Sequence, residues 1–299
     1  MNNINFKHSI IFFNLCILAS PVYLILNFEP IVICLFLILI IGISHGALDN
    51  IKGKKLLKLF GLKYNFFFYF IYLVISFLII ILWLIFPNTT LLLFLIVAAY
   101  HFGKEDTTFT FKRKFLLAEC LFFFKGSSII IAPLLFQRNA TNQIFNTLNF
   151  NIFESSFFND YLLIFFLFLS FISSIYLPYK KNFNLKSLMI MDFFSIIILN
   201  YFLTPIIAFT IYFCFLHSIR HSITLIFELN KNFFSGFKIF ISKAIPLTFI
   251  TGIAFVAAIY YLNNIYELDE AIYKVIFIGL ASLTFPHILL EYLLEKNEK

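Results

Sequence analysis

Uncharged apolar stretches of about 18 or more residues recur along the whole chain, and as helices each is long enough to cross about 30 Å of hydrocarbon. The stretch 66–86, for example, contains no charged side chain. Charged residues make up 12% of the 299 positions, against about 25% in an ordinary soluble domain. The sequence therefore predicts an all-α, polytopic membrane helix bundle, with residues 1–299 forming a single integral membrane domain.

Ten transmembrane helices are expected, at about 9–28, 30–49, 66–86, 88–103, 114–136, 159–177, 187–203, 205–228, 244–262 and 271–294. The predicted orientation has both the N- and the C-terminus in the cytoplasm, because most of the 22 Lys and Arg residues then lie in cytoplasmic segments. This distribution explains the net charge of +7 without nucleic acid as a partner. We expect a multi-pass protein of the cell (inner) membrane, surrounded by lipid, with one longer polar loop at about 137–158 on the outer side.

Five of the six histidines fall within or at the ends of these predicted spans. Each of the five lies in the middle or the inner half of an even-numbered span; they are His45, His101, His217, His221 and His287. Ionisable side chains at membrane depth are costly and usually mark a functional site. The sixth, His8, lies at the edge of the first span and is expected to have no role.

The spacing of His217 and His221 places both imidazoles on one face of a helix, about one turn apart. Together with His45 and His101 they form a possible four-nitrogen metal site, and imidazole suits Fe, Zn, Cu and Ni. Four neutral ligands leave the charge of a divalent ion unbalanced, so carboxylates are expected to bind the ligating imidazoles. Asp49, one turn after His45, is the preferred candidate.

Other ionisable residues near the predicted site leave alternatives open. Glu105 and Glu291 follow His101 and His287 by one turn, but both also lie where the cytoplasmic interface is expected. Arg220 lies between the paired histidines, and a structural ion pair is the preferred interpretation for it. Its candidate partners are Asp49, Asp106 and Asp192.

Four short motifs resemble those of the Brp/Blh family, the bacterial and archaeal membrane β-carotene 15,15'-dioxygenases. His45-Gly46-Ala47-Leu48-Asp49 resembles HGxxD, and His101-Phe102-Gly103 with Asp106 resembles HFGxxD. His217-Ser218-Ile219-Arg220-His221 matches HSxRH, and Pro286-His287 resembles the terminal PH element. The four occur in the order of the family and cover nearly the whole chain, although Lys104-Glu105 is a more polar pair than expected there.

The resemblance implies an iron-dependent enzyme that cleaves β-carotene at its central double bond with O₂, giving two all-trans-retinals. It implies Fe(2+) bound by His45, His101, His217 and His221, with no catalytic residue beyond these ligands. Asp49 and His287 are expected to bind a ligand's second N–H or to act as an extra ligand. The bilayer would supply the substrate, and a microbial rhodopsin would use the retinal. From their position, Tyr100, Phe102 and Phe285 are expected to line the substrate slot.

Two other classes of function remain as alternatives. A di-iron membrane desaturase or hydroxylase normally has about eight histidines, and only five lie at membrane depth here. A non-enzymatic transporter could use the histidines and acids to relay protons. The iron content of the purified protein separates these possibilities, because the dioxygenase should hold one iron per chain, the di-iron class two, and a transporter none.

Overall fold

The computed structural model describes residues 2–26, 30–44, 46–61, 66–107, 116–155, 158–178 and 183–297. About 90% of the chain is helical, and the described part contains no strand. The helices of more than one turn are α1 (Asn2–Leu26), α2 (Ile31–Leu37), α3 (Asp49–Leu59), α4 (Phe66–Ile85), α5 (Pro87–Glu105), α6 (Leu116–Phe136), α7 (Arg138–Thr147), α8 (Asp160–Tyr176), α9 (Phe183–Phe202), α10 (Pro205–Ile211), α11 (Ile219–Leu229), α12 (Phe233–Leu262) and α13 (Leu268–Asn297).

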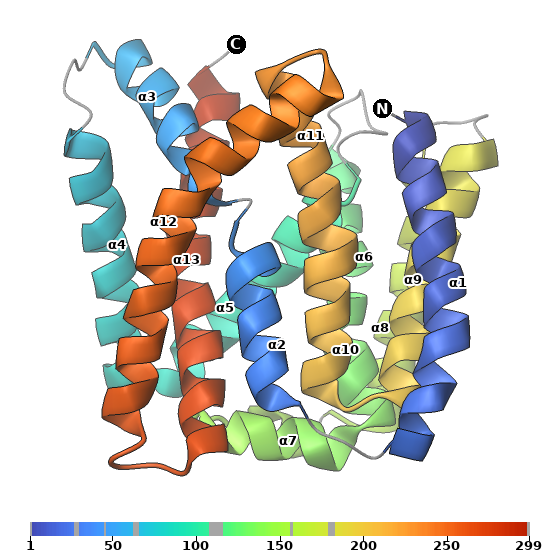
Figure 1. Ribbon diagram of the computed structural model, residues 1–299. Coiled ribbons are helices and arrows are strands. Elements are labelled where there is room, and N and C mark those ends of the chain that lie inside the picture. Colours follow the sequence, from blue (N-terminus) through green and yellow to red (C-terminus); the bar gives the residue numbers. More distant parts are fainter. Residues whose placement is uncertain are drawn as a thin grey trace.

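The long helices form a bundle in which the chain repeatedly crosses from one end to the other (Figure 1). Both termini lie at the same end, which is the arrangement that an even number of crossings produces. Within the described part of the chain, eight helical segments are long and apolar enough to span a membrane. The all-α, polytopic membrane bundle expected from the sequence is therefore confirmed, while the orientation of the bundle in the membrane remains a prediction.

Two of the ten expected spans fall short of either the length or the hydropathy of a membrane span. They correspond to α5 and α8, of which α8 has 17 residues. The two helices pack against α6, and α5 also contacts α4 and α13. A helix that is largely surrounded by other helices meets little lipid, so polar residues such as His101 on α5 cost less there than on the lipid-facing side.

The second expected span, 30–49, is not one continuous helix. After α2 the chain widens into a π-helix, η1 (Ile38–Gly42), and then turns before a 3₁₀ segment, η2 (Gly46–Leu48). Asp49 is consequently the first residue of α3 and not the end of the preceding helix. A second π-helix, η5 (Tyr212–Ser218), lies between α10 and α11 and carries His217. Such wide turns are frequent at functional sites.

The expected outer loop at 137–158 contains secondary structure. It forms α7, which lies across the end of the bundle opposite to the termini, and a 3₁₀ turn, η4 (Ile152–Glu154) (Figure 1). Ile144 and Phe145 of α7 are buried. The sequence pattern was dominated by polar residues, so the two apolar side chains that face the bundle were missed.

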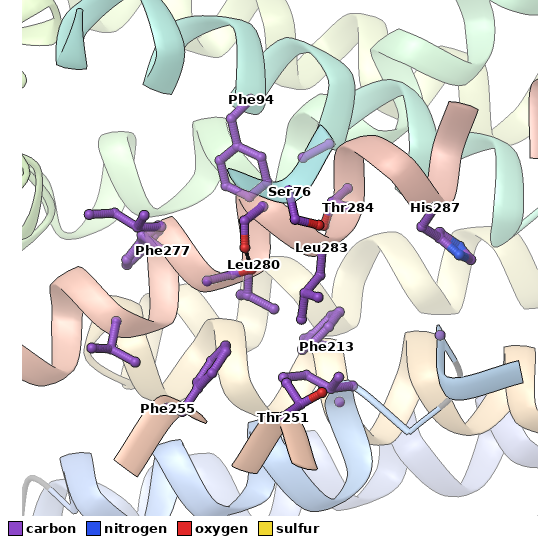
Figure 2. A pocket seen from close by; sticks show the side chains of 18 of the residues that line it. Ser76, Phe94, Phe213, Thr251, Phe255, Phe277, Leu280, Leu283, Thr284 and His287 are labelled. Atoms are coloured by element: carbon purple, nitrogen blue, oxygen red, sulfur yellow. Dashed lines mark hydrogen bonds between the residues drawn. The ribbon is translucent and has the colours of Figure 1, made fainter. Parts of the chain in front are cut away.

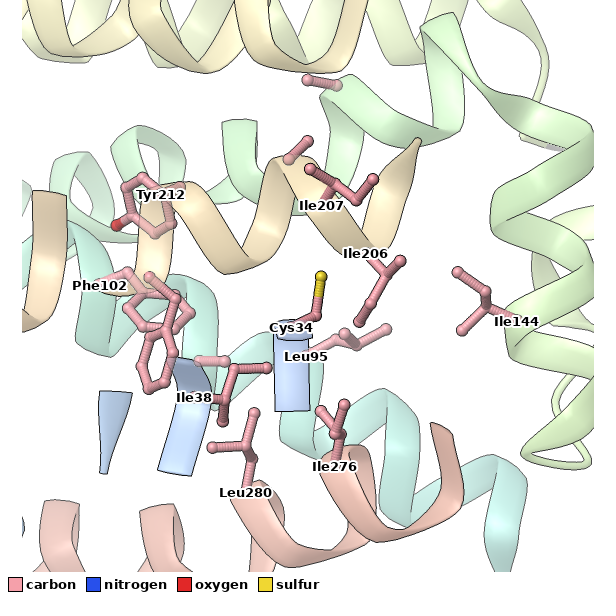
Figure 3. Close-up of a cluster of buried hydrophobic side chains, with 14 of the residues drawn as sticks. Cys34, Ile38, Leu95, Phe102, Ile144, Ile206, Ile207, Tyr212, Ile276 and Leu280 are labelled. Carbon is pink, nitrogen blue, oxygen red and sulfur yellow. The ribbon is translucent and has the colours of Figure 1, made fainter. Parts of the chain in front are cut away.

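The main hydrophobic core lies where α2, α5, α10 and α13 meet (Figure 3). Ile38 and Leu216 are fully buried in it, and Ile276 of α13 reaches the same cluster. This core holds together the helices that carry the histidines, and the histidines lie at neighbouring ends of those helices. Rigid packing of this kind holds a site in place to within a fraction of an ångström.

Reporter fusions should place the four connections at the terminal end of the bundle on one side of the membrane. The fusion points are after Lys63, Lys114, Lys181 and Lys231, and all four are expected to report the cytoplasm. Lys231 precedes α12, which begins eleven residues before the predicted span. A periplasmic signal from one fusion with a cytoplasmic signal from the others would contradict the topology.

Candidate metal centre

Four of the five histidines expected at membrane depth come together in the structure. They come from α5 (His101), η5 (His217), α11 (His221) and α13 (His287). The ring centroids of His101 and His287 are 5.2 Å apart, and those of His101 and His217 are 5.5 Å apart. His221 joins the cluster through His287, at 6.2 Å. His45 lies outside the described residues, so its expected place in the cluster stays a prediction.

Three of these imidazoles are held by a carboxylate at Nδ1. His217 Nδ1 lies 2.9 Å from an oxygen of Asp106, and His287 Nδ1 lies 2.8 Å from an oxygen of Asp49. His221 Nδ1 lies 3.0 Å from Glu105. A neutral imidazole that donates its Nδ1–H keeps the lone pair on Nε2, which is the usual arrangement of a metal-ligating histidine. The carboxylates expected around the site are therefore present.

Each of these acids binds a histidine on another helix. The sequence analysis associates Asp49 with His45 and Glu105 with His101, one turn apart on the same helix. In the structure Asp49 begins a new helix and faces α13, where it meets His287. Glu105 ends α5 and meets His221 of α11. The helix break before Asp49 and the end of α5 place both carboxylates beside the histidines of other helices.

Two tyrosines extend the contacts outward from the carboxylates. The Tyr212 hydroxyl donates to Asp106 across 2.6 Å. The Tyr72 hydroxyl lies 3.1 Å from Asp49 and equally far from the backbone carbonyl oxygen of Leu283. These bonds fix the carboxylates, which in turn fix the imidazoles. The role of these two tyrosines could not be predicted from the sequence, because aromatic residues are so common in this chain that no local signal distinguishes them.

Glu291 lies between the histidines of different helices. Its carboxylate, with nitrogens of His101 and His287, forms one group of possible ligand atoms that lie within 4.8 Å of one another. A second such group consists of Glu291, Glu105 and His221. Lys52 binds Glu291 across 2.7 Å. Glu291 can thus serve as a further oxygen ligand or as the counter-charge that orders Lys52 beside the centre.

The electrostatic balance of this region fits a divalent cation. Charged side chains that are buried or partly buried gather around the imidazoles; the acids are Asp49, Glu105, Asp106, Asp192 and Glu291, and the cations are Lys52, Lys125 and Arg220. Lys104, also partly buried, is paired with the exposed Glu295, so with neutral imidazoles the five acids exceed the three other cations by two negative charges. Uncompensated buried charge is strongly unfavourable. One ion such as Fe(2+), bound by imidazole nitrogens, would remove the excess, so the donor set and the charge both fit.

Arg220 forms a structural ion pair, as preferred from the sequence, and its partner is Asp192. The guanidinium makes two bonds to this carboxylate, of 2.7 and 3.1 Å, and a third to Ser9 of α1. His8 of α1 donates from Nε2 to the backbone carbonyl oxygen of Phe215 in η5, across 2.8 Å. No role was expected for His8 from the sequence. In the structure, His8 supports the π-helix that carries His217.

An apolar cavity of about 800 Å³ adjoins the cluster. His101, His217 and His287 form part of its wall, and most of the remaining wall is aliphatic or aromatic (Figure 2). The size lies within the usual range for small-molecule sites, about 300–1,000 Å³. Along α13 the wall extends from His287 to Lys274, which is thirteen residues or about 20 Å of helix.

The expected slot residues are only partly in this wall. Phe102 lines the cavity and packs edge-on against His217, with ring centroids 4.7 Å apart. Tyr100 and Phe285 are not among the described residues that form this wall, so their place in a substrate slot stays a prediction. Tyr100 faces α6, where its hydroxyl donates to Glu119. Phe285 packs against the main core.

The cavity opens toward the lipid-facing surface between α4 and α12. Phe77 of α4 and Ile250 of α12 belong to the wall, yet they are 67% and 62% exposed. Both helices pack against α13, which forms the back of the cavity. A hydrophobic molecule dissolved in the bilayer can therefore reach the histidines without passing through water.

Comparison with known proteins identifies the family. A family model described as beta-carotene 15,15'-dioxygenase matches residues 36–295, which is most of the chain. The chain belongs to this family. In this member of the beta-carotene 15,15'-dioxygenase family, the matched residues include all four histidines of the cluster.

A curated family member gives a second, shorter match. The beta-carotene 15,15'-dioxygenase of an uncultured marine bacterium (66A03) is 32% identical over 111 residues. The alignment covers 37% of this chain and 38% of the relative. No solved structure matches the fold.

Proposed function

We propose that this protein is an iron-dependent dioxygenase that cleaves β-carotene at its central 15,15' double bond with O₂ and releases two all-trans-retinals. The observation that carries the proposal is the buried histidine cluster in the wall of an apolar cavity of about 800 Å³ that is open to lipid. Membership of the beta-carotene 15,15'-dioxygenase family and the name of the curated relative support the same substrate.

The residues that would hold the iron are His101, His217 and His221, together with His45. His287 lies in the same cluster and is a further candidate ligand. Bound iron would supply the activation of O₂ that a reaction between O₂ and an alkene requires. The protein's own contribution is to keep each ligating nitrogen in place: Asp106 and Asp49 retain the Nδ1 protons of His217 and His287 and so direct Nε2 toward the centre.

The cavity would orient the polyene and keep water away from the reacting bond. β-Carotene carries no polar group, so its position depends on shape alone. One arm would lie in the deep part of the cavity, which extends about 20 Å along α13. The other arm would lie along the opening between α4 and α12, and the central bond would then lie beside the histidines. Fixing a reactant at the right distance supplies much of the rate enhancement of an enzyme.

Expression in a bacterium that accumulates β-carotene tests the proposal. We expect the cells to lose their orange colour and to accumulate retinal in a ratio of two retinals for each β-carotene lost. Cells that express the His217→Ala variant at the same level should remain orange and serve as the control. Orange cells that contain well-folded parent protein would contradict the proposed function.

The iron content decides between the proposed enzyme and its alternatives. One iron per chain supports the dioxygenase, two would favour the di-iron desaturase or hydroxylase class, and none would favour transport. In the cell we place the protein in the cell (inner) membrane as a multi-pass protein, with a microbial rhodopsin as the consumer of the retinal.

Replacing Asp49 by Asn tests whether this carboxylate orients a histidine of the cluster without being needed to bind the metal. The amide keeps the shape of the carboxylate but loses its charge, so it holds His287 Nδ1–H less firmly. We expect a loss of about 10- to 100-fold in cleavage, with iron partly retained. Retinal formation and iron content are measured on the same sample. Parent-like activity would show that the Asp49–His287 contact has no part in the reaction.

A further inference from the structure

Two buried hydroxyl groups in the cavity wall lack a hydrogen-bond partner within the described part of the chain. They belong to Ser76 of α4, which is 8% exposed, and to Thr248 of α12. By contrast, the Thr251 hydroxyl, in the same wall, donates to the Leu247 carbonyl. An unpaired hydroxyl in an apolar wall is unfavourable. Ser76 and Thr248 are therefore expected to find their partner in whatever occupies the cavity.

Ser76 lies one helical turn from a residue that is linked to the histidine cluster through Asp49. The residue one turn before it, Tyr72, bonds to the carboxylate of Asp49, which holds His287. Ser76 follows Tyr72 by four residues, about 6 Å along α4 and toward the deep part of the cavity. Figure 2 draws it with Thr284 and Leu283 of α13 among the residues that line the cavity, and α4 packs against α13.

Thr248 approaches the same level from another helix. Leu247, its neighbour in α12, packs with Ala47 and Leu48, the two residues that precede Asp49. Ser76 thus follows the Tyr72–Asp49–His287 contacts by one helical turn, and Thr248 lies beside Leu247 in the same cavity wall.

We propose that Ser76 and Thr248 bind the carbonyl oxygen of the conjugated aldehyde product. This inference rests on the proposed function, because the hydrocarbon substrate has no atom that can accept these hydrogen bonds. Cleavage replaces one C=C bond by two C=O bonds, so it creates two acceptors at the histidine end of the cavity. The hydroxyls therefore distinguish product from substrate, and they hold the new aldehyde ends inside the cavity after cleavage.

Retinal binding to the purified full chain tests this assignment. The variants are Ser76→Ala and Thr248→Val, each of which removes a hydroxyl with little change in volume. Ser173→Ala and Thr210→Val are matched controls, since those buried hydroxyls already donate to the carbonyls of Leu169 and Ile206. The Kd for all-trans-retinal is measured directly, and the KM for β-carotene is measured in parallel.

We expect the Kd for retinal to rise by about 3- to 10-fold in each variant, the loss typical of one hydrogen bond. The KM for β-carotene should stay within about twofold of the parent value, and the controls should bind retinal normally. An unchanged Kd for retinal in both variants would overturn the proposal and show that the hydroxyls bind only water. An effect confined to carotenoids with oxygenated end rings would also overturn it, because the hydroxyls would then recognise substrate.

The two proposals can fail separately. If the parent protein does not cleave β-carotene but binds retinal more tightly than Ser76→Ala does, the proposed function is wrong and the carbonyl site stands. If the parent protein cleaves β-carotene and all variants bind retinal equally, the enzyme assignment stands and the role of Ser76 and Thr248 is wrong.

Discussion

Alanine in place of His217 is expected to abolish β-carotene cleavage and to release most of the bound iron. His217 is 1% exposed, and the contact of its Nδ1 with Asp106 leaves Nε2 as the nitrogen that can bind a metal. A residue that only orients a ligand typically contributes about 10- to 100-fold to metal affinity or activity. Removing the ligand itself should cost more. The same outcome is expected for His45→Ala, His101→Ala and His221→Ala. Retinal formation and iron per chain are the measurements.

His8→Ala is the matched control for these substitutions. It removes an imidazole that bonds to the backbone of the same π-helix, whereas the ring contacts of the cluster join His101, His217, His221 and His287. We expect it to keep its iron and to lose about 1 kcal/mol of stability, the usual value of one hydrogen bond. A histidine variant of the cluster that retains both iron and activity would exclude that residue from the metal site.

Gly103→Ala is expected to prevent correct packing of α5 against α6. A Cβ at Gly103 would lie 1.8 Å from the backbone oxygen of Phe122, and one at Gly126 would lie 1.9 Å from that of Ala99. Backbone cannot move aside as a flexible side chain can, so α5 must shift as a whole and carry His101 with it. Overpacking normally costs about 1–3 kcal/mol, and we expect at least the upper value here. Thermal unfolding in detergent and retinal formation should both decline.

Gly252→Ala provides the matched control for this substitution. Gly252 lies in α12, and a Cβ there would meet nothing within 4 Å. Alanine in a helix is favoured over glycine by about 1 kcal/mol, so this variant should be as stable as the parent or slightly more stable. Equal stability of Gly103→Ala and the parent would show that α5 and α6 do not approach as closely as described.

The fold could be predicted largely from the positions of apolar stretches and lysines. The ends of the elements were less predictable, because a helix can continue beyond the hydrocarbon. α12 begins at Phe233 instead of near 244, and α7 forms in a stretch that appears only polar. The break before Asp49 follows from a π-helix and a turn, which have no signature in the hydropathy pattern.

The site was predictable in its composition but not in its pairings. Histidines placed at one depth on several helices indicated a shared centre, and His101, His217, His221 and His287 do meet. The partner of each carboxylate depends on which helices become neighbours, and no local spacing encodes that. Arg220 illustrates the limit: three acids were possible from the sequence, and only the packing of α9 against α1 selects Asp192.

The two sides of the histidine cluster face different phases. On one side lie acids and the ammonium group of Lys52, partly exposed at the ends of α3 and α5, and on the other lies the hydrocarbon-lined cavity. In the proposed enzyme, a metal ion would arrive from the aqueous side and a polyene from the hydrocarbon of the bilayer. Metal loading and turnover would then depend on separate reservoirs. Metal supply and chelators would affect the first, and the composition and fluidity of the bilayer would affect the second.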